Sequence, residues 1–164
     1  LGLRSGQIIA DIGSGGGYFT YRFAKAVGEN GKVYAVDINQ EFLTFIKKQA
    51  IEQGLQNIIT LFSPSELPTL PTRTFDLIFM RNVTHHLPHR IKYFQILKDT
   101  LKPLGRIAII EYDGRGRYFS FQRLHRHYVP KDQLIEEMRQ AGYVMQKSYD
   151  LLPEQSFIVF TPRE

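Results

Sequence analysis

Short apolar runs alternate with stretches of helical spacing along most of the chain. In the first half this pattern predicts strands over residues 7–12, 32–37 and 57–62 and helices over residues 18–27 and 40–53. Each helix stops at a glycine, Gly28 or Gly54. The expected inward-facing residues are Phe19, Phe23, Ala26 and Val27 in the first helix and Phe42, Phe45, Ile46, Gln49 and Ala50 in the second.

The same alternation continues in the second half. Strands are predicted over residues 75–80 and 106–112, with a helix over 89–101 and a turn over 102–105 between them. A helix over 131–141 precedes strands at 143–149 and 156–161, which should form an antiparallel hairpin because no helix separates them. Residues 63–74 are proline-rich and must form a loop, and residues 113–130 lack a clear period. The pattern predicts one α/β domain over 1–164, with a mostly parallel sheet covered on both faces.

Composition excludes several classes of protein. The 164 residues are 43% hydrophobic, and no apolar run approaches the roughly 20 residues that a membrane span needs. The chain has no cysteine, which excludes disulfides, thiolate zinc sites, cysteine nucleophiles and iron–sulfur clusters. The formal net charge of +5 is more typical of a solubility feature than of a nucleic-acid-binding surface.

A glycine-rich loop follows the first predicted strand and opens the first predicted helix. Ligands of open parallel sheets bind at the carboxyl ends of the strands, and glycines there let the backbone approach a ligand closely. A nicotinamide fingerprint counted from Gly13 would need glycine where the chain has Tyr18. Asp11 precedes the loop, where its charge would repel a pyrophosphate but attract a ligand that carries an ammonium or a sulfonium.

A second acidic residue, Asp37, ends the second predicted strand, twenty residues after Gly17. A carboxylate at this position accepts hydrogen bonds from the hydroxyls of a ribose. It supports an adenosine-containing ligand without choosing between cofactor families. Both aspartates could instead cap turns, but their spacing to the glycines favours the binding role.

Four ordered segments of the chain resemble the class I methyltransferases, which use S-adenosylmethionine. They are residues 10–19 (ADIGSGGGYF), 33–37 (VYAVD), 75–78 with 84–87 (FDLI, THHL) and 101–106 (LKPLGR). The resemblance implies a doubly wound, Rossmann-like sheet of seven strands, in which the last strand is antiparallel and lies between its neighbours. It also implies S-adenosylmethionine as cofactor and S-adenosylhomocysteine as product.

The resemblance also implies a role for each matching position. The loop from Gly13 to Gly17 would hold the methionine portion with support from Asp11, Asp37 would bind the ribose, and Ile38 would pack on adenine. The segment after the third strand, 63–68, departs from the family because Pro64 has no N–H to donate to adenine. The full set of expected cofactor-binding residues is Asp11, Gly13, Ser14, Gly15, Gly17, Tyr18, Asp37, Ile38, Ser63, Ser65, Glu66, Arg81 and Asn82.

Candidates for catalysis lie near the expected substrate mouth. His85 or His86 could accept a proton during transfer, and Tyr112 could orient a substrate. Alternatively, one of the histidines caps the next helix or occupies a polar boundary position, and Tyr112 only contributes to packing. Glu111 is interpreted as a charged strand end. His85 and His89 are four residues apart, but no nearby carboxylate completes a metal set, so we expect no metal site.

Two basic and aromatic runs, 115–118 and 123–128, could grip an anionic or aromatic substrate or form a solvated lid. Residues 81–84 lack the Asn/Asp-Pro-Pro-Tyr/Phe pattern of many enzymes that methylate base amines, so nucleic acid is an unlikely partner. The expected acceptor is a small molecule, and the ubiquinone/menaquinone-type enzymes suggest O- or N-methylation by analogy alone. A regulatory domain that binds the cofactor without transfer, or a nicotinamide-dependent oxidoreductase, is the alternative.

The ends of the chain add two further expectations. About seven residues precede the first strand, so we expect the chain to lack the cap helices of the family and to bind cofactor weakly or be inactive. The expected compartment is the cytoplasm, and nothing in the pattern specifies an oligomeric state.

Overall fold

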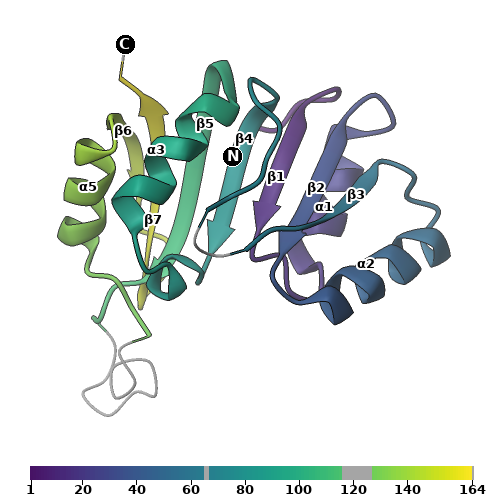
Figure 1. The fold of residues 1–164 in the computed structure, drawn as a ribbon, viewed down its shortest axis with the longest axis horizontal. Coiled ribbons are helices and arrows are strands. Elements are labelled where there is room, and N and C mark those ends of the chain that lie inside the picture. Colours follow the sequence, from purple (N-terminus) through teal and green to yellow (C-terminus); the bar gives the residue numbers. More distant parts are fainter. Residues whose placement is uncertain (65–66, 116–126, 164) are drawn as a thin grey trace.

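The computed structural model describes residues 1–64, 67–115 and 127–163 and contains one sheet of seven strands in the order β3-β2-β1-β4-β5-β7-β6 (Figure 1). The strands are β1 (Ile8–Ile12), β2 (Lys32–Asp37), β3 (Ile58–Phe62), β4 (Phe75–Arg81), β5 (Leu101–Tyr112), β6 (Tyr143–Tyr149) and β7 (Gln155–Pro162). The helices are α1 (Tyr18–Val27), α2 (Gln40–Glu52), α3 (Arg90–Thr100) and α5 (Lys131–Gln140), with a short 3-10 helix η1 (Thr84–His86).

The sheet has the mixed topology that the resemblance implies. β1 pairs in parallel with both β2 and β4, β2 with β3, and β4 with β5, so the carboxyl ends of these strands meet at one edge (downwards in Figure 1). β7 is antiparallel to both β5 and β6 and lies between them, which confirms the predicted hairpin.

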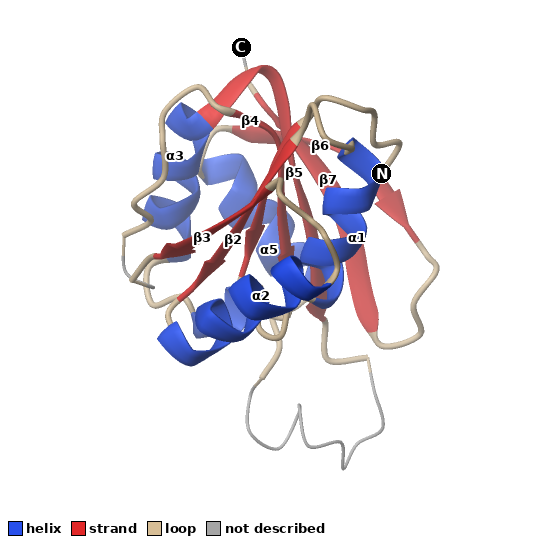
Figure 2. Cartoon of the chain, turned by 90° about the vertical axis from the view of Figure 1, so that its right-hand side faces the viewer, coloured by secondary structure: helices blue, strands red, loops and turns tan. Residues whose placement is uncertain are grey.

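Helices cover both faces of the sheet, as predicted for a doubly wound fold. Phe23 and Val27 of α1 pack on one face with Leu77 and Phe79 of β4, whereas Phe94 of α3 belongs to the apolar cluster of the other face. Figure 2 shows α1 and α3 on opposite sides of the sheet. No helix in the described ranges combines the length and the apolar character that a membrane crossing requires.

Parts of the predicted helix faces were wrong. In α2 the buried residues are Leu43, Ile46 and Ala50, whereas Phe42 is 45% exposed and Phe45 is 49% exposed. Residues 43, 46 and 50 lie on one face of the helix, and this face packs against β2 and β3. Phe42 is turned towards the carboxyl edge of the sheet, where it lines a cavity. In α1, Ala24 is buried in place of the expected Ala26, which is exposed.

The start of β5 was also predicted wrongly. The strand begins at Leu101, which pairs with Phe75, and the register then jumps so that Leu77 pairs with Arg106. The predicted turn at 102–105 is therefore an irregularity inside a strand pair. A Cβ on Gly105 would lie 2.6 Å from the carbonyl oxygen of Phe75, so glycine permits this close approach of two backbones.

Candidate cofactor site

A cavity of about 600 Å³ opens at the carboxyl ends of β1, β2 and β4. This volume lies within the range of small-molecule sites. The position is the one where parallel α/β sheets bind ligands. The lining residues are Ile12, Gly13, Gly15, Val36, Asp37, Ile38, Asn39, Phe42, Ser63, Arg81, Asn82, Val83, His86, Leu87 and Tyr93.

The glycine loop is tied to the end of β2 by its backbone. The N–H groups of Gly13 and Ser14 both donate to the carbonyl oxygen of Val36, at 2.8 and 3.1 Å. Gly13 has a φ of 70°, and a Cβ there would lie 2.1 Å from a methyl carbon of Val83. Only glycine therefore allows the loop to pass this close to the segment after β4.

Asp37 lies where the glycine loop meets the start of α2. Its Oδ2 accepts a hydrogen bond from the N–H of Gly15 at 2.8 Å, and its Oδ1 accepts one from the N–H of Asn39 at 2.9 Å. The side chain is half-buried and lines the cavity. Each carboxylate oxygen has two lone pairs, so both can accept a further hydrogen bond from a ligand hydroxyl.

Asp11 is buried beneath the loop and accepts a hydrogen bond from Thr20 Oγ1 at 2.6 Å. Burial raises the pKa of Asp11 from its ordinary 3.8 to about 7, the bond from Thr20 opposes this rise, and the negative charge of Asp37 adds to it. A cation at the loop would favour the ionised form. Asp11 is therefore suited to support a positively charged ligand, although it does not line the cavity itself.

Several features of the site fit an adenosyl sulfonium compound. Within the described ranges, Ser14 Oγ and Tyr21 Oη are buried without a hydrogen-bond partner, and buried polar groups are normally paired. A Cβ on Gly15 or Gly16 would contact nothing within 4 Å, so a ligand can approach the loop backbone there. Ile38, which is 60% exposed, lines the cavity beside Phe42 and offers apolar contact to a base.

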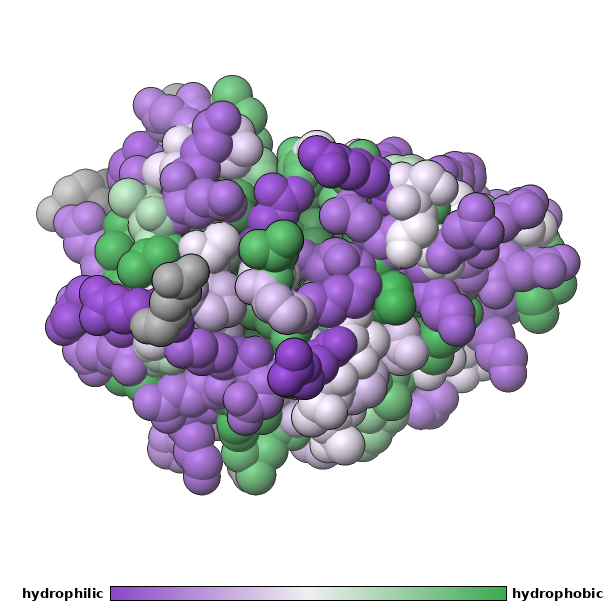
Figure 3. All heavy atoms as spheres, turned by 90° about the horizontal axis from the view of Figure 1, so that it is seen from above, coloured by the Kyte–Doolittle hydropathy of each residue, from purple (hydrophilic) through white to green (hydrophobic). Residues whose placement is uncertain are grey.

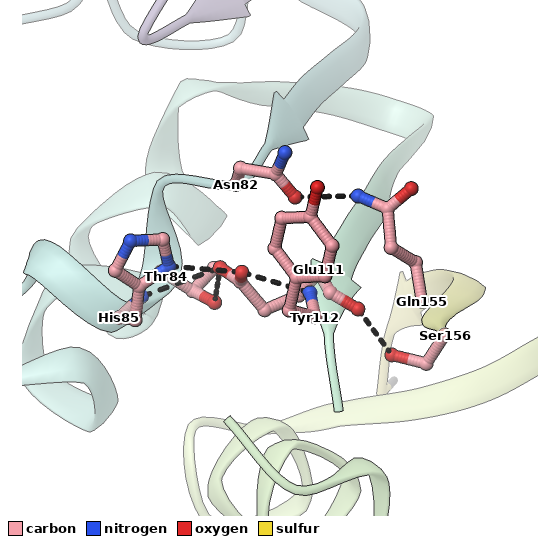
Figure 4. Close-up of polar contacts among 7 residues, drawn as sticks. All are labelled: Asn82, Thr84, His85, Glu111, Tyr112, Gln155 and Ser156. Atoms are coloured by element: carbon pink, nitrogen blue, oxygen red, sulfur yellow. Dashed lines mark hydrogen bonds and ion pairs between the residues drawn. The ribbon is translucent and has the colours of Figure 1, made fainter. Parts of the chain in front are cut away.

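The mouth of the cavity is formed by the end of β4 and the residues that follow it. Asn82 has a φ of 54°, its N–H donates to the carbonyl oxygen of Ile110 at 2.8 Å, and its Oδ1 accepts from Gln155 Nε2 at 2.6 Å (Figure 4). Arg81 is exposed, with its guanidinium carbon 5.5 Å from the centre of the Phe19 ring. Asparagine is one of the few residues besides glycine that adopt a positive φ readily, so Asn82 can hold this conformation at the mouth.

Glu111 is the centre of a buried polar network behind this mouth (Figure 4). Its side chain is fully buried, and Oε2 accepts from Thr84 Oγ1 at 2.6 Å and from the N–H of His85 at 3.3 Å. Oε1 lies 2.9 Å from His85 Nδ1 and accepts from the N–H of Tyr112 at 3.0 Å. The interpretation of Glu111 as a charged strand end was therefore wrong, because the carboxylate positions η1 from the end of β5.

Three histidines gather at the same mouth. The ring centres of His85 and His86 are 4.0 Å apart, and that of His127 lies 5.2 Å from His85 and 5.5 Å from His86. His86 lines the cavity, whereas the side chain of His85 is 6% exposed and faces Glu111. Burial lowers the pKa of His86, the neighbouring histidines add to this effect, and Glu111 opposes it.

The remaining predicted site residues are placed as follows. Ser63 lines the cavity, where its Oγ accepts from the N–H of Thr69 at 3.0 Å, while Ser65 and Glu66 lie outside the described residues. Tyr18 is 60% exposed at the start of α1, with Arg22 over its ring, and does not line the cavity; nor does Tyr112. Most of the two basic and aromatic runs, residues 116–126, also lies outside the described part of the chain.

A second cavity of about 650 Å³ lies at the opposite edge of the sheet, between the end of α1 and the amino ends of β2 and β3, beside Gly28, Lys32 and Asn57. The side of the molecule that carries the amino ends of the parallel strands is mainly hydrophilic, with apolar side chains scattered among hydrophilic ones (Figure 3). None of the predicted site residues lines this second cavity. The candidate functional residues therefore lie at the carboxyl edge of the sheet.

Sequence reasoning missed several lining residues: Asn39, Val83, Leu87 and Tyr93. Asn39 carried a readable signal, since an asparagine before a helix is a common N-cap and its Oδ1 accepts from the N–H of Glu41 at 2.8 Å. Val83 and Leu87 lie in the irregular segment after β4, and Tyr93 lies in the predicted helix α3, whose cavity-facing side the pattern did not specify.

Comparison with known proteins agrees with this arrangement. A family model described as "Methyltransferase domain" matches residues 3–152. Aklanonic acid methyltransferase DauC of Streptomyces sp. is 32% identical over 117 residues, which are 71% of this chain and 53% of that protein. The ubiquinone/menaquinone biosynthesis C-methyltransferase UbiE of Hydrogenovibrio crunogenus is 29% identical over 112 residues, 68% of this chain and 44% of that protein.

The chain thus spans about half the length of these curated relatives. Among solved structures, a SAM-dependent methyltransferase from Aquifex aeolicus matches with a TM-score of 0.88 and 27% identity, covering 97% of this chain and 84% of that one. The family model, the relatives and the seven-stranded topology agree. The chain belongs to the class I S-adenosylmethionine-dependent methyltransferase family.

Proposed function

We propose that this chain binds S-adenosylmethionine in the carboxyl-edge cavity and transfers its methyl group to a small-molecule acceptor that enters beside Arg81, Asn82 and His86. The observation that carries the proposal is the convergence of the glycine loop and Asp37 on one cavity, with the Gly15 N–H bonded to the Asp37 carboxylate at 2.8 Å. An adenosyl compound requires a close backbone approach at one end and a ribose acceptor next to it.

The chain would hold each part of the cofactor with a different element. Asp37 would accept hydrogen bonds from the ribose hydroxyls, and Ile38 and Phe42 would pack against adenine. The glycine loop and Ser14 Oγ would bind the amino-acid end, where the ionised form of Asp11 would be favoured by the positive charge nearby.

S-adenosylmethionine supplies a methyl group that is already activated on a sulfonium, so the protein mainly has to position the acceptor in line with it. Holding two reactants in line can contribute roughly 7 to 11 kcal/mol. Asn82, fixed by Ile110 and Gln155, provides a rigid wall at the mouth. Where the acceptor must lose a proton, His86 is placed to take it, because its lowered pKa keeps it neutral near pH 7.

The site and the relatives support a small-molecule acceptor. DauC and UbiE are both named for small-molecule chemistry. The mouth next to the cavity combines the cation of Arg81, the amide of Asn82 and the imidazole of His86, which suits a polar or anionic small molecule more than a polymer. We also propose that the protein acts in the cytoplasm.

A transfer assay tests the proposal. The chain is incubated with S-adenosylmethionine and a library of hydroxylated, aminated and quinone-type small molecules, and S-adenosylhomocysteine and methylated products are followed by mass spectrometry. Product formation that is lost in Asp37→Ala and kept in the exposed control Asp132→Ala is expected. Cofactor binding without transfer to any acceptor would favour the regulatory alternative, and binding of NAD in its place would refute the proposal.

A further inference from the structure

The three histidines at the mouth form a cluster, of which the proposed methyl transfer uses only His86, and only where the acceptor must lose a proton. One ring nitrogen from each of His85, His86 and His127 can be chosen so that all three atoms lie within 4.8 Å of one another. His85 and His86 come from η1, and His127 comes from 41 residues further along the chain. Three imidazoles that converge from separate segments are a common ligand set for borderline divalent metal ions.

The buried carboxylate of Glu111 gives this cluster a second feature of metal sites. Glu111 Oε1 lies 2.9 Å from His85 Nδ1, and a carboxylate oxygen accepts, so the Nδ1 of His85 carries the proton. The lone pair of His85 is then on Nε2. Metal-bound histidines almost always donate their other ring N–H to a carboxylate or carbonyl, which fixes the ring and raises its basicity.

Binding of an ion requires the three ring nitrogens to move closer together. In a tetrahedral site with metal–nitrogen distances of about 2.0 to 2.1 Å, the nitrogens are about 3.3 Å apart. The present spread of up to 4.8 Å would have to close to that value by side-chain rotation, and His86 is exposed and His127 half-buried. The rings already lie 4.0 to 5.5 Å apart between centres.

We propose that His85, His86 and His127 bind one divalent transition-metal ion of the zinc and cobalt type, with Glu111 as the positioning carboxylate behind His85. Three protein ligands leave a fourth position open, and because His86 lines the cavity, that position faces the substrate mouth. This site was not predicted from the sequence, because the spacing suggested only His85 and His89 as a pair of ligands. The spacing gave no indication that His127 and Glu111 lie next to His85.

Metal binding is measured without S-adenosylmethionine, so its outcome is independent of the proposed transfer activity. Co²⁺ is titrated into the metal-free chain and followed by its visible absorption and by calorimetry. One ion per chain is expected, with the dissociation constant raised at least tenfold in His86→Gln and in His127→Gln. The matched control His89→Gln, an exposed histidine next to the cluster, should stay within twofold of the unchanged chain.

Two further variants separate ligands from support. His85→Gln should also lose the ion, but it removes a partner of buried Glu111 and is interpreted only if its circular dichroism and thermal unfolding match the unchanged chain. Glu111→Gln should weaken binding by about 10- to 100-fold, the usual effect of removing such a carboxylate. Absence of one-to-one Co²⁺ binding, or equal affinity in the His86, His127 and His89 variants, would overturn the proposal.

Discussion

Replacing Asp11 with asparagine should remove a specific pH dependence from the stability of the ligand-free chain. Burial raises the pKa of Asp11 from 3.8 to about 7 in the folded state. Between these values the folded chain holds a proton that the unfolded chain has released, so the stabilisation is fully present below about pH 4 and is lost as the pH rises through 7. Asparagine cannot ionise, and its Oδ1 can still accept the bond from Thr20.

The size of the effect follows from the two pKa values. One pKa unit corresponds to about 1.4 kcal/mol, so the full change is on the order of 4 kcal/mol. Of this, on the order of 3 kcal/mol falls between pH 5 and 8. In a domain of this size, that corresponds to roughly 6 to 12 °C in melting temperature.

The assay is thermal and urea unfolding of both chains at pH 5, 6, 7, 8 and 9. Asp11→Asn should gain stability relative to the unchanged chain as the pH rises, with most of the gain between pH 5 and 7. The control Asp132→Asn replaces an exposed carboxylate and should follow the unchanged chain. Parallel stability curves for Asp11→Asn and the unchanged chain would refute the assignment of a protonated, buried carboxyl group.

Four further substitutions, one of them a matched control, test the site and its support. Asp37→Ala should weaken S-adenosylmethionine binding by about 1 to 3 kcal/mol in calorimetry, because it removes two charge-assisted ribose contacts; unchanged affinity in a folded variant would contradict the assigned pose. Gly13→Ala should destabilise the chain by roughly 2 to 5 kcal/mol in urea unfolding, because its Cβ would lie 2.1 Å from Val83 in addition to the strain of a φ of 70°. Gly54→Ala, with a φ of 68° and no neighbour within 4 Å, should cost only about 1 to 2 kcal/mol, and equal losses would show that the Val83 contact is unimportant. Glu111→Ala leaves several buried donors without an acceptor and should cost roughly 2 to 5 kcal/mol; a melting temperature within 2 °C of the unchanged chain, about the shift for 1 kcal/mol, would contradict the network.

Local patterns predicted most of the fold because strands and helices here begin and end at residues with strong preferences. The bounds predicted for the first helix, 18–27, match α1, since Gly17 and Gly28 flank it. The face of α2 was harder, because Phe42 is apolar but points to a cavity that a bound base can cover. The start of β5 depends on pairing between Leu101 and Phe75, which is a tertiary contact.

Some residues of the candidate site could likewise be predicted from the sequence, whereas others could not. Asp11, Gly13 and Asp37 were predicted from their spacing, because the carboxyl ends of neighbouring parallel strands must meet. Glu111 and His127 were not, because they meet η1 only when β5 and the segment before α5 are folded over it. A glutamate that directly follows the apolar run 107–110 is the sequence signal that could have identified Glu111, because a charged side chain at the end of a buried strand needs partners.

A crystal structure of the chain soaked in S-adenosylmethionine tests most directly whether the carboxyl-edge crevice binds an adenosyl sulfonium compound. We expect density for the ligand along the glycine loop, with both ribose hydroxyls on Asp37 and the methyl group directed towards Asn82. Density elsewhere on the molecule, or an empty crevice at saturating ligand, would contradict it.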